Sequence, residues 1–393
     1  MTRRRALIAG GGVGGLAAAL ALTRAGWDAR VFERAAAIGE VGAGIQISAN
    51  GYRALKALGV AEEIRAGAFA PEAVIMRAGR SGRRLVEVPL GEAGAARWGA
   101  PYLQVHRADL IETLRRALER AAPGAVRTGA EVAGYETGPD GAALRLASGE
   151  TVEGALLIGA DGIRSTIREA MLGPEAPRFT GAVAWRAAIP RAALEGAGIE
   201  PAAVIWAGRG RHAVTYPLRG GTLLNFVGVV GEDDWRGESW TEPGDPARLR
   251  AAFAGWAAPL TRLIDRIEAP FRWALFDRAP LPRWSDGRAV LLGDACHPMP
   301  PSLAQGACQA LEDACALAAR LGPGAGDIPA ALRAHYAARI SRVSRVQREA
   351  RANLRRFHAG GLERAAAGAA GAAAPWWFAR RLDWLYRGDE RAM

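Results

Sequence analysis

Short apolar runs separated by glycines and polar turns open the chain and predict its first elements. Residues 5–9 (RALIA) fit a buried strand, residues 14–25 an alanine- and leucine-rich helix, and residues 29–33 (ARVFE) a second strand. This order predicts a βαβ unit. Helical periodicity returns at residues 52–58 and, with leucines four apart, at residues 108–121, so both segments are predicted to be packing helices.

A β-rich pattern occupies the middle of the chain. Between residues 178 and 283, short strands with more Trp and Pro predict a separate domain. Its clearest feature is a hairpin in which residues 211–218 and 222–230 flank Arg219-Gly220-Gly221.

Buried-strand patterns on both sides of this region extend the opening βαβ unit. Residues 142–147 and 151–159 predict strands, the second ending in an unbroken apolar run typical of a parallel sheet. The same pattern recurs at residues 288–293 (RAVLLG), and helices are predicted at residues 305–321 and 328–358. The first domain is therefore predicted to be discontinuous.

The C-terminal part is predicted to be helical, with a flexible Gly/Ala tether at residues 359–374 and a short amphipathic end containing Trp376, Trp377, Trp384 and Leu385. Arginines recur three or four apart in the preceding helix, and we interpret them as a solvated face: Arg342, Arg345, Arg348, Arg351 and Arg355.

Charge and composition limit the classes of partner. The formal charge is +11, but Lys56 is the only lysine and the arginines are scattered among acidic residues. Without a basic stripe or interleaved aromatics, no nucleic-acid partner is predicted, whereas a basic balance suits an anionic ligand.

The cysteines and the N-terminus bear on compartment and on metals. Cys296, Cys308 and Cys315 have neither CxxC spacing nor paired histidines, so we expect no metal site and no disulfide framework. Arg3 to Arg5 and the apolar run behind them imitate a secretory signal, but five glycines between Gly10 and Gly15 interrupt it. We therefore expect a cytoplasmic protein with no membrane span.

A glycine-rich turn between the first strand and helix carries the first chemical signal. Gly10-x-Gly12-x-x-Gly15 provides a tight turn, backbone access for a pyrophosphate and close packing of helix on strand. Glu33, at the end of the second strand, is placed to bind a ribose. Together they predict a dinucleotide site.

Further motifs connect the chain to a known family. They are GGGVGG at 10–15, GAGIQ at 42–46, HRADL at 106–110, GADGIRSTIR at 159–168 and GDACHPMPPSLAQGACQALEDA at 293–314. With these motifs the chain resembles the class A FAD-dependent monooxygenases of the para-hydroxybenzoate hydroxylase superfamily along nearly its whole length. The salicylate and 3-hydroxybenzoate hydroxylase branch is the most similar.

This resemblance implies FAD as cofactor and NADH or NADPH as cosubstrate, the nicotinamide having no Rossmann domain of its own. In the family, Arg107 contacts the flavin, Asp161 supports FAD and nicotinamide binding, and Asp294 holds the ribityl chain; Cys308 stands where many relatives have Asn, and we assign it no redox role. The predicted FAD-binding residues are Gly10, Gly12, Val13, Gly14, Gly15, Glu33, Arg34, Gly44, Gln46, Arg107, Val132, Asp161, Asp294, Gly306 and Ala307.

The predicted fold class is α/β, with a discontinuous Rossmann-type FAD-binding domain, an inserted β-rich substrate domain and a helical C-terminal region. The FAD-binding domain is expected to comprise residues 1–72, 101–177 and 284–325. The substrate domain is expected to comprise residues 73–100 and 178–283, and the C-terminal region residues 326–393.

Two polar side chains in the β-rich domain are the leading catalytic candidates. His212 and Tyr216 lie four apart on a predicted strand and so share a face. Relatives acting on hydroxylated aromatic acids carry a similar pair, and His can accept a phenolic proton near neutral pH. The alternative is a cross-strand packing pair. Gln305 is a third candidate, Gln46 and Arg186 are weaker pocket candidates, and His297 is interpreted as a turn residue.

The resemblance implies hydroxylation of a small (hydroxy)aromatic acid with NAD(P)H and O2 through a C4a-hydroperoxyflavin, in a monomer or homodimer. Two alternatives stay open. The same chemistry could act on a urate-like heterocycle, a polyketide or an alkene to be epoxidised, or the chain could be a non-catalytic FAD- or nucleotide-binding regulator, which the intact motifs disfavour. A halogenase is disfavoured because Lys56 is the only lysine.

Overall fold

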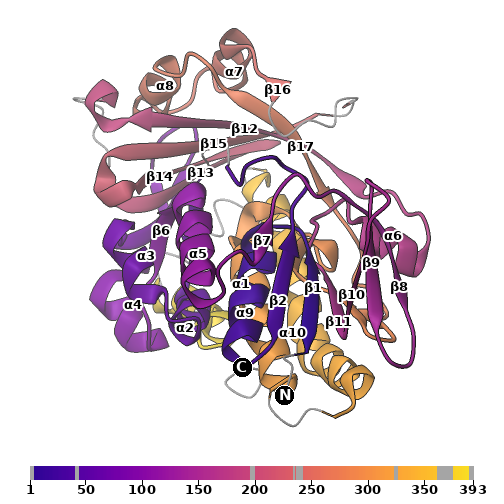
Figure 1. The fold of residues 1–393 in the computed structure, drawn as a ribbon. Helices are drawn as coiled ribbons and strands as arrows, with labels where there is room; N and C mark the ends of the chain where they lie inside the picture. Colours follow the sequence, from indigo (N-terminus) through magenta and orange to yellow (C-terminus); the bar gives the residue numbers. More distant parts are fainter. Residues whose placement is uncertain are drawn as a thin grey trace.

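The computed structural model describes residues 4–39, 44–194, 200–232, 235, 242–322, 326–360 and 375–388. Within these residues, six strands form the sheet of the first domain (Figure 1). They are, in sheet order, β18 (Ser285–Asp286), β19 (Ala289–Leu291), β11 (Leu156–Gly159), β1 (Arg5–Ala9), β2 (Asp28–Phe32) and β7 (Val126–Arg127). All neighbours pair in parallel except β18 with β19. The strands come from three separate stretches of the chain, as expected for a doubly wound sheet interrupted by insertions.

A second sheet, eight-stranded over the described ranges, lies across one end of the first domain (Figure 1). Its order is β16 (Glu242–Pro243), β17 (Phe271–Asp277), β12 (Arg178–Pro190), β15 (Leu223–Gly231), β14 (Arg211–Leu218), β13 (Ala202–Gly208), β4 (Ala73–Ala78) and β5 (Arg84–Pro89). The predicted hairpin is confirmed, since β14 and β15 pair antiparallel around Arg219 to Gly221. Because β4 pairs with β13, we propose that residues 73–89 belong to the substrate domain.

Two smaller sheets and the helices complete the described architecture. The strands are β10 (Thr151–Gly154), β9 (Ala142–Leu146) and β8 (Val132–Thr137) in one sheet, and β3 (Gly44–Ile47) with β6 (Leu103–His106) in the other. The helices are α1 (Val13–Arg24), α2 (Ala49–Ala57), α3 (Ala61–Gly67), α4 (Gly91–Trp98), α5 (Arg107–Ala121), α6 (Thr166–Leu172), α7 (Pro246–Ala252), α8 (Ala258–Asp265), α9 (Gly306–Arg320), α10 (Ile328–Phe357), α12 (Pro375–Arg381) and α13 (Asp383–Tyr386).

The apolar faces of the helices and sheets determine where the cores of the two domains lie. Helix α1 is buried nearly all round, because it packs against the parallel sheet, α5 and α9 at once. In the second domain, α7 and α8 cover the face of the eight-stranded sheet that is turned away from the first domain (Figure 1), packing on Trp185 and Phe226. The opposite face of that sheet is left to line a cavity.

Two sequence-based predictions need correction. Residues 151–159 are not one strand, since β10 pairs with β9 while β11 pairs with β1 and β19. An apolar run alone does not reveal which sheet each half joins. The predicted βαβ opening is confirmed by β1, α1 and β2.

The arginines of α10 do not all form a solvated face. Arg345, Arg348 and Arg355 are exposed, but Arg342 donates to Glu312 and Arg351 donates to Asp277. The prediction failed because the acidic partners lie 30 and 74 residues away in the chain. The predicted tether falls largely on residues 361–374, which lie outside the described residues.

Candidate active site

A cavity of about 1600 Å³ lies between the first domain and the eight-stranded sheet. Its walls come from the glycine-rich turn and the start of α1, from β3, from the start of α9, from β12, β14 and β17, and from the ends of α10 and α13. A cavity of this size that reaches both sheets can hold a dinucleotide and a second small molecule together.

The glycine-rich turn forms one end of the cavity. Gly10 has φ +102°, a conformation that favours glycine, and a Cβ at Gly15 would lie 1.9 Å from the Gly10 carbonyl oxygen, so α1 could not pack this closely with any other residue there. Gly12, Val13 and Gly14 line the cavity. Among the described residues, no side chain caps α1 and no acidic residue lies in its first turn, so its N–H groups and partial positive charge remain for a phosphate.

Glu33 braces this turn. Its carboxylate accepts hydrogen bonds from the Gly11 N–H at 2.7 Å and the Ala35 N–H at 2.9 Å. Its neighbour Arg34 lines the cavity, whereas Glu33 is not among the lining residues. In this structure Glu33 therefore holds the turn in shape, and ribose binding by its carboxylate stays a prediction.

Two carboxylates face the cavity from the ends of parallel strands. Asp294 follows β19 and accepts no hydrogen bond within the described part of the chain, and desolvation by the surrounding cavity walls raises the pKa of its carboxyl against the lowering effects of His297 and Arg107. Asp161 follows β11; its Oδ2 accepts from the Ile167 N–H at 3.3 Å while its Oδ1 is buried without a partner. Such carboxylates suit the hydroxyl groups of a polyol or ribose.

The start of α9 forms the opposite wall. Gly306 and Ala307 line the cavity, and within the described part of the chain this helix, too, has no side-chain cap and no acidic residue in its first turn. Its positive end can therefore stabilise negative charge on a bound ring system. With the glycine turn and Asp294, whose carboxylate has no hydrogen-bond donor among the described residues, these features fit FAD.

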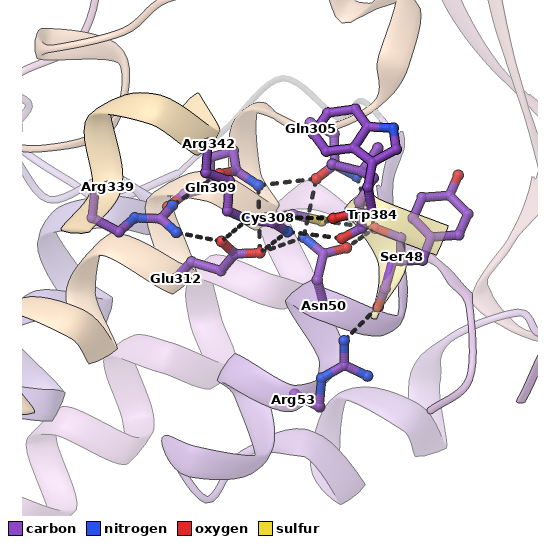
Figure 2. Close-up of polar contacts among 12 residues, drawn as sticks. Ser48, Asn50, Arg53, Gln305, Cys308, Gln309, Glu312, Arg339, Arg342 and Trp384 are labelled. Atoms are coloured by element: carbon purple, nitrogen blue, oxygen red, sulfur yellow. Dashed lines mark hydrogen bonds and ion pairs between the residues drawn. The ribbon is translucent and has the colours of Figure 1, made fainter. Parts of the chain in front are cut away.

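A buried polar network fixes this wall from behind (Figure 2). The Gln305 amide donates to Ser48 Oγ at 2.8 Å and accepts from Asn50 at 3.0 Å, and Asn50 in turn donates to Glu312 at 2.6 Å. Arg339 and Arg342 neutralise Glu312 from α10. Because both ends of its amide are engaged, Gln305 is a fixed part of the cavity wall, and its catalytic role stays a prediction.

His297 belongs to the same buried polar network behind the cavity wall. Its Nε2 lies 2.5 Å from Asp313 Oδ2, the ring is 1% exposed, and Asp313 also accepts from Arg339. His297 is thus held as a buried structural partner near the turn after β19.

Across the cavity, His212 and Tyr216 lie on β14 and both line the same space. Tyr216 packs against β3, since a Cβ at Gly44 would lie 2.5 Å from its hydroxyl oxygen. Burial raises the pKa of Tyr216, while Arg186, which also lines the cavity, lowers it less. Tyr216 therefore keeps its proton and can donate a hydrogen bond.

His212 contacts a partner that the sequence motifs did not predict. Its Nδ1 lies 2.8 Å from Nε2 of His358, at the end of α10. Burial and His358 hold the pKa of His212 well below its ordinary value. His212 is therefore neutral at physiological pH and can accept a proton.

The C-terminal segment supplies residues that sequence reasoning missed. Phe378, Trp384 and Tyr386 line the cavity, and the Tyr386 and Tyr102 rings lie 5.9 Å apart. The Tyr102 hydroxyl donates to Gln46 at 2.6 Å. Only the clustered tryptophans hinted that this segment packs on something, and they did not say where.

Several arginines anchor this segment. Arg97 forms an ion pair with Asp383 at 2.7 Å. Arg342 donates to the carbonyl oxygens of Trp384 and Leu385 (Figure 2 shows Arg342 and Trp384), and Arg53 donates to that of Tyr386. The segment is thereby attached both to α4 and to the network behind the cavity.

Most predicted site residues lie around this cavity. Its lining includes Gly12, Val13, Gly14, Arg34, Gly44, Gln46, Arg107, Asp161, His212, Tyr216, Asp294, Gln305, Gly306 and Ala307. Four predicted FAD-binding residues are not in the lining: Gly10, Gly15, Glu33 and Val132. Gly10, Gly15 and Glu33 shape the turn, whereas Val132 packs in β8 against another hydrophobic cluster, so direct FAD contact by its side chain is not supported.

Among the described residues, no three His, Cys, Asp or Glu side chains are grouped to hold a metal ion, and no helix is long and apolar enough to cross a membrane.

Comparison with known proteins extends over both domains. A family model described as FAD binding domain matches residues 3–346. The chain is 40% identical over 356 residues to a 3-amino-4-hydroxybenzoate 2-monooxygenase of Streptomyces platensis, covering 91% of this chain and 89% of the relative. It is 38% identical over 385 residues to 3-hydroxybenzoate 6-hydroxylase 1 of Aquipseudomonas alcaligenes, covering 97% and 96%. It is also similar to the crystal structure of Klebsiella pneumoniae HpxO complexed with FAD and uric acid, with a TM-score of 0.83, 29% identity and coverage of 98% and 96%.

Proposed function

Because the chain belongs to the FAD binding domain family and, within it, to the class A flavin monooxygenases, we propose that it hydroxylates a small aromatic acid carrying a ring hydroxyl. The family resemblance predicted from the motifs is confirmed. The observation that carries the proposed reaction is that one continuous cavity joins the glycine turn and Asp294 to His212, Tyr216 and Arg186.

FAD, when bound and reduced by NAD(P)H, supplies the chemistry that activates O2 for hydroxylation. The chain would hold it with the start of α1, Arg34, Asp161, Asp294 and the start of α9, all of which line the cavity. The protein's own contribution is to orient the substrate ring, to exclude water and to manage the phenolic proton.

The polar groups of the substrate side match a hydroxylated aromatic acid. Arg186, whose guanidinium carbon lies 4.0 Å from the centre of the Trp273 ring, brings positive charge to the cavity and suits a carboxylate. His212 is neutral and suits the phenolic proton, and Tyr216 can donate to an oxygen of the ring. Apolar side chains such as Val214 and Val227 line the rest of this wall and suit the ring itself.

A urate-like heterocycle is the rival substrate, because HpxO is described with uric acid. The identities favour the aromatic acid: 38 to 40% to the hydroxybenzoate-acting relatives against 29% to HpxO. A non-catalytic regulator is disfavoured, because such a protein would not need His212, Tyr216 and Arg186 in the same cavity as the residues that would hold FAD.

The decisive experiment is anaerobic reduction of the purified yellow holoenzyme by NADH and by NADPH. Each would be tested with 3-hydroxybenzoate, salicylate, 3-amino-4-hydroxybenzoate, 6-hydroxynicotinate and urate, followed by product analysis after O2 is admitted. We expect one of the aromatic acids to accelerate reduction and to give a hydroxylated product. Hydroxylation of urate alone, or H2O2 as the only product with every acid, would refute the proposal.

We also propose that the enzyme works in the cytoplasm as a monomer or homodimer. All three cysteines are unpaired, and Cys296 and Cys308 are buried, which suits a reducing compartment. Fractionation of expressing cells and light scattering of the purified holoenzyme test these two points separately.

A further inference from the structure

A pair of histidines connects the cavity to the outside of the molecule. His212 is 3% exposed and lines the cavity, whereas His358, at the end of α10, is partly exposed. Their rings are joined by the 2.8 Å contact between His212 Nδ1 and His358 Nε2. His212 Nε2 makes no hydrogen bond within the described residues, so it is the nitrogen left for a ligand in the cavity.

We propose that His358 is the second member of a proton path, taking up the proton that a substrate phenol gives to His212 and passing it to solvent. This rests on the proposed function, because it needs a phenolic substrate in the cavity. His358 does not touch the substrate, so it acts by relay and by positioning the His212 ring.

Burial is the reason that His212 needs such a partner. A proton that remained on His212 would create an imidazolium in an enclosed cavity that already contains Arg186, and charge in such surroundings is costly. The second imidazole faces His212 and Arg211 from β14, and Arg355 and Arg356 on its own helix are exposed. Burial and Arg211 lower the pKa of His358 to about 4, so this ring also releases its proton at neutral pH.

The transfer balances without any added reagent. In the resting pair, His212 Nδ1–H donates to His358 Nε2, and His358 carries its own proton on Nδ1. The phenol O–H bond breaks as His212 Nε2 gains the proton, the Nδ1 proton moves to His358 Nε2, and the His358 Nδ1 proton leaves to water. Protonation of the product phenolate along the same path in reverse restores both tautomers.

The fold holds the end of α10 against β14 independently of the His358 imidazole. The Gly210 N–H donates to the His358 carbonyl oxygen at 3.1 Å, and the Phe357 ring packs against His212 with centroids 5.1 Å apart. Side-chain substitution at His358 should therefore leave the end of α10 in place. This makes His358→Gln and His358→Ala usable variants.

The test follows proton release without turnover. Anaerobic holoenzyme without nicotinamide is mixed rapidly with 3-hydroxybenzoate in weakly buffered solution containing a pH-indicator dye, and benzoate, which lacks the hydroxyl, serves as the ligand control. We expect fast proton release from wild type with 3-hydroxybenzoate and none with benzoate. Both His358 variants should release the proton about 10- to 100-fold more slowly, with FAD content and benzoate affinity unchanged.

Two further measurements distinguish a proton relay through His358 from a purely structural role of this residue. Gln can keep a hydrogen bond to His212 but cannot carry the proton onward, so release at the wild-type rate in His358→Gln would overturn the proposal. In His358→Ala, added imidazole should restore fast release, and failure to do so would count against the path. Arg355→Gln, an exposed change on the same helix, is the matched control and should release at the wild-type rate.

A failure of the proposed function would give a different result from a failure of the relay. If neither 3-hydroxybenzoate nor the other acids of the reduction panel perturb the flavin spectrum of wild type, the aromatic-acid assignment is wrong and the relay falls with it. If wild type binds and hydroxylates a phenolic acid but both His358 variants release protons normally, only the relay is wrong.

Discussion

Arg339 is the side chain whose removal tests most directly how the wall behind the cavity is held. It is fully buried on α10 and donates to Asp313 at 2.7 Å, to Glu312 at 2.5 Å and to Gln309 at 2.8 Å (Figure 2 shows Arg339, Glu312 and Gln309). The substitution Arg339→Met keeps most of the volume but leaves two buried carboxylates without their shared cation. We expect it to be strongly destabilising.

The magnitude follows from Glu312. Burial raises the pKa of its carboxyl, but Arg339 and Arg342 lower it further, so that it falls from 4.5 to about 2. At 1.36 kcal/mol per pKa unit, this corresponds to about 3 kcal/mol in favour of the charged form. Loss of one partner from a buried ion pair generally costs about 3–5 kcal/mol, and we expect Arg339→Met to fall in that range.

The sign of the pH dependence is also determined. In wild type, the pKa values of Glu312 and Asp313 are lower in the folded state than in the unfolded state. The two carboxylates therefore stabilise the folded state when the pH is above their unfolded pKa values, and this stability is lost as the pH falls toward about 2. Without Arg339, Glu312 keeps Arg342 and Asp313 keeps His297, but one cation fewer opposes the effect of burial, so the pKa of each carboxyl rises from its wild-type value. The folded variant therefore binds more protons than folded wild type on the acid side, and its deficit should be larger at pH 7 than at pH 3.

Urea unfolding of both proteins at the two pH values measures this. Arg348→Met is the matched control, because Arg348 is exposed on the same helix, and it should change stability by less than about 0.5 kcal/mol. An Arg339→Met deficit as small as that of the control, or one that does not change with pH, would refute the account of two buried carboxylates that share the Arg339 guanidinium.

Three further predictions concern the cavity itself. Asp294→Asn should weaken FAD binding by about 10- to 100-fold, because a charged hydrogen-bond acceptor is lost, and titration of apoprotein with FAD checks this; unchanged affinity would remove Asp294 from the cofactor site. Gly15→Ala would place a methyl 1.9 Å from the Gly10 carbonyl oxygen and should cost at least about 2 kcal/mol in stability, seen as a lower Tm, whereas Gly12→Ala, whose Cβ meets no atom within 4 Å, should leave the Tm of the apoprotein nearly unchanged. Tyr386→Phe should raise KM for the aromatic substrate about fivefold at unchanged FAD affinity, since it removes a hydroxyl from the cavity lining beside Tyr102; a change confined to FAD affinity would contradict a role of Tyr386 in substrate binding.

Much of the fold could be predicted from local sequence patterns, because the periodicity that identifies a helix or a strand depends only on consecutive residues. The βαβ opening, the α9 helix and the β14–β15 hairpin lie within a few residues of their predicted bounds. Residues 151–159 were misjudged because their apolar pattern is the same whether the chain stays in one sheet or crosses between two.

The candidate site, too, contains residues that the sequence could predict and one contact that it could not. The glycine turn and Asp294 were predictable because a strand followed by a glycine turn places backbone N–H groups and a carboxylate at the sheet edge where ligands bind. His212 and Tyr216 were predictable as a same-face pair, since strand geometry alternates side chains. Nothing in the sequence linked His212 to His358, which is 146 positions away.

By itself, therefore, the sequence determined the dinucleotide turn, the family and the residue types available for catalysis, since each depends on short-range spacing. The tertiary structure decided that the arginines of α10 neutralise buried carboxylates, that the C-terminal segment carrying Tyr386 completes the cavity, and that His212 has an outlet through His358. These contacts join residues tens to hundreds of positions apart, and only the packing of α10 and α13 against the two domains brings them within hydrogen-bond distance.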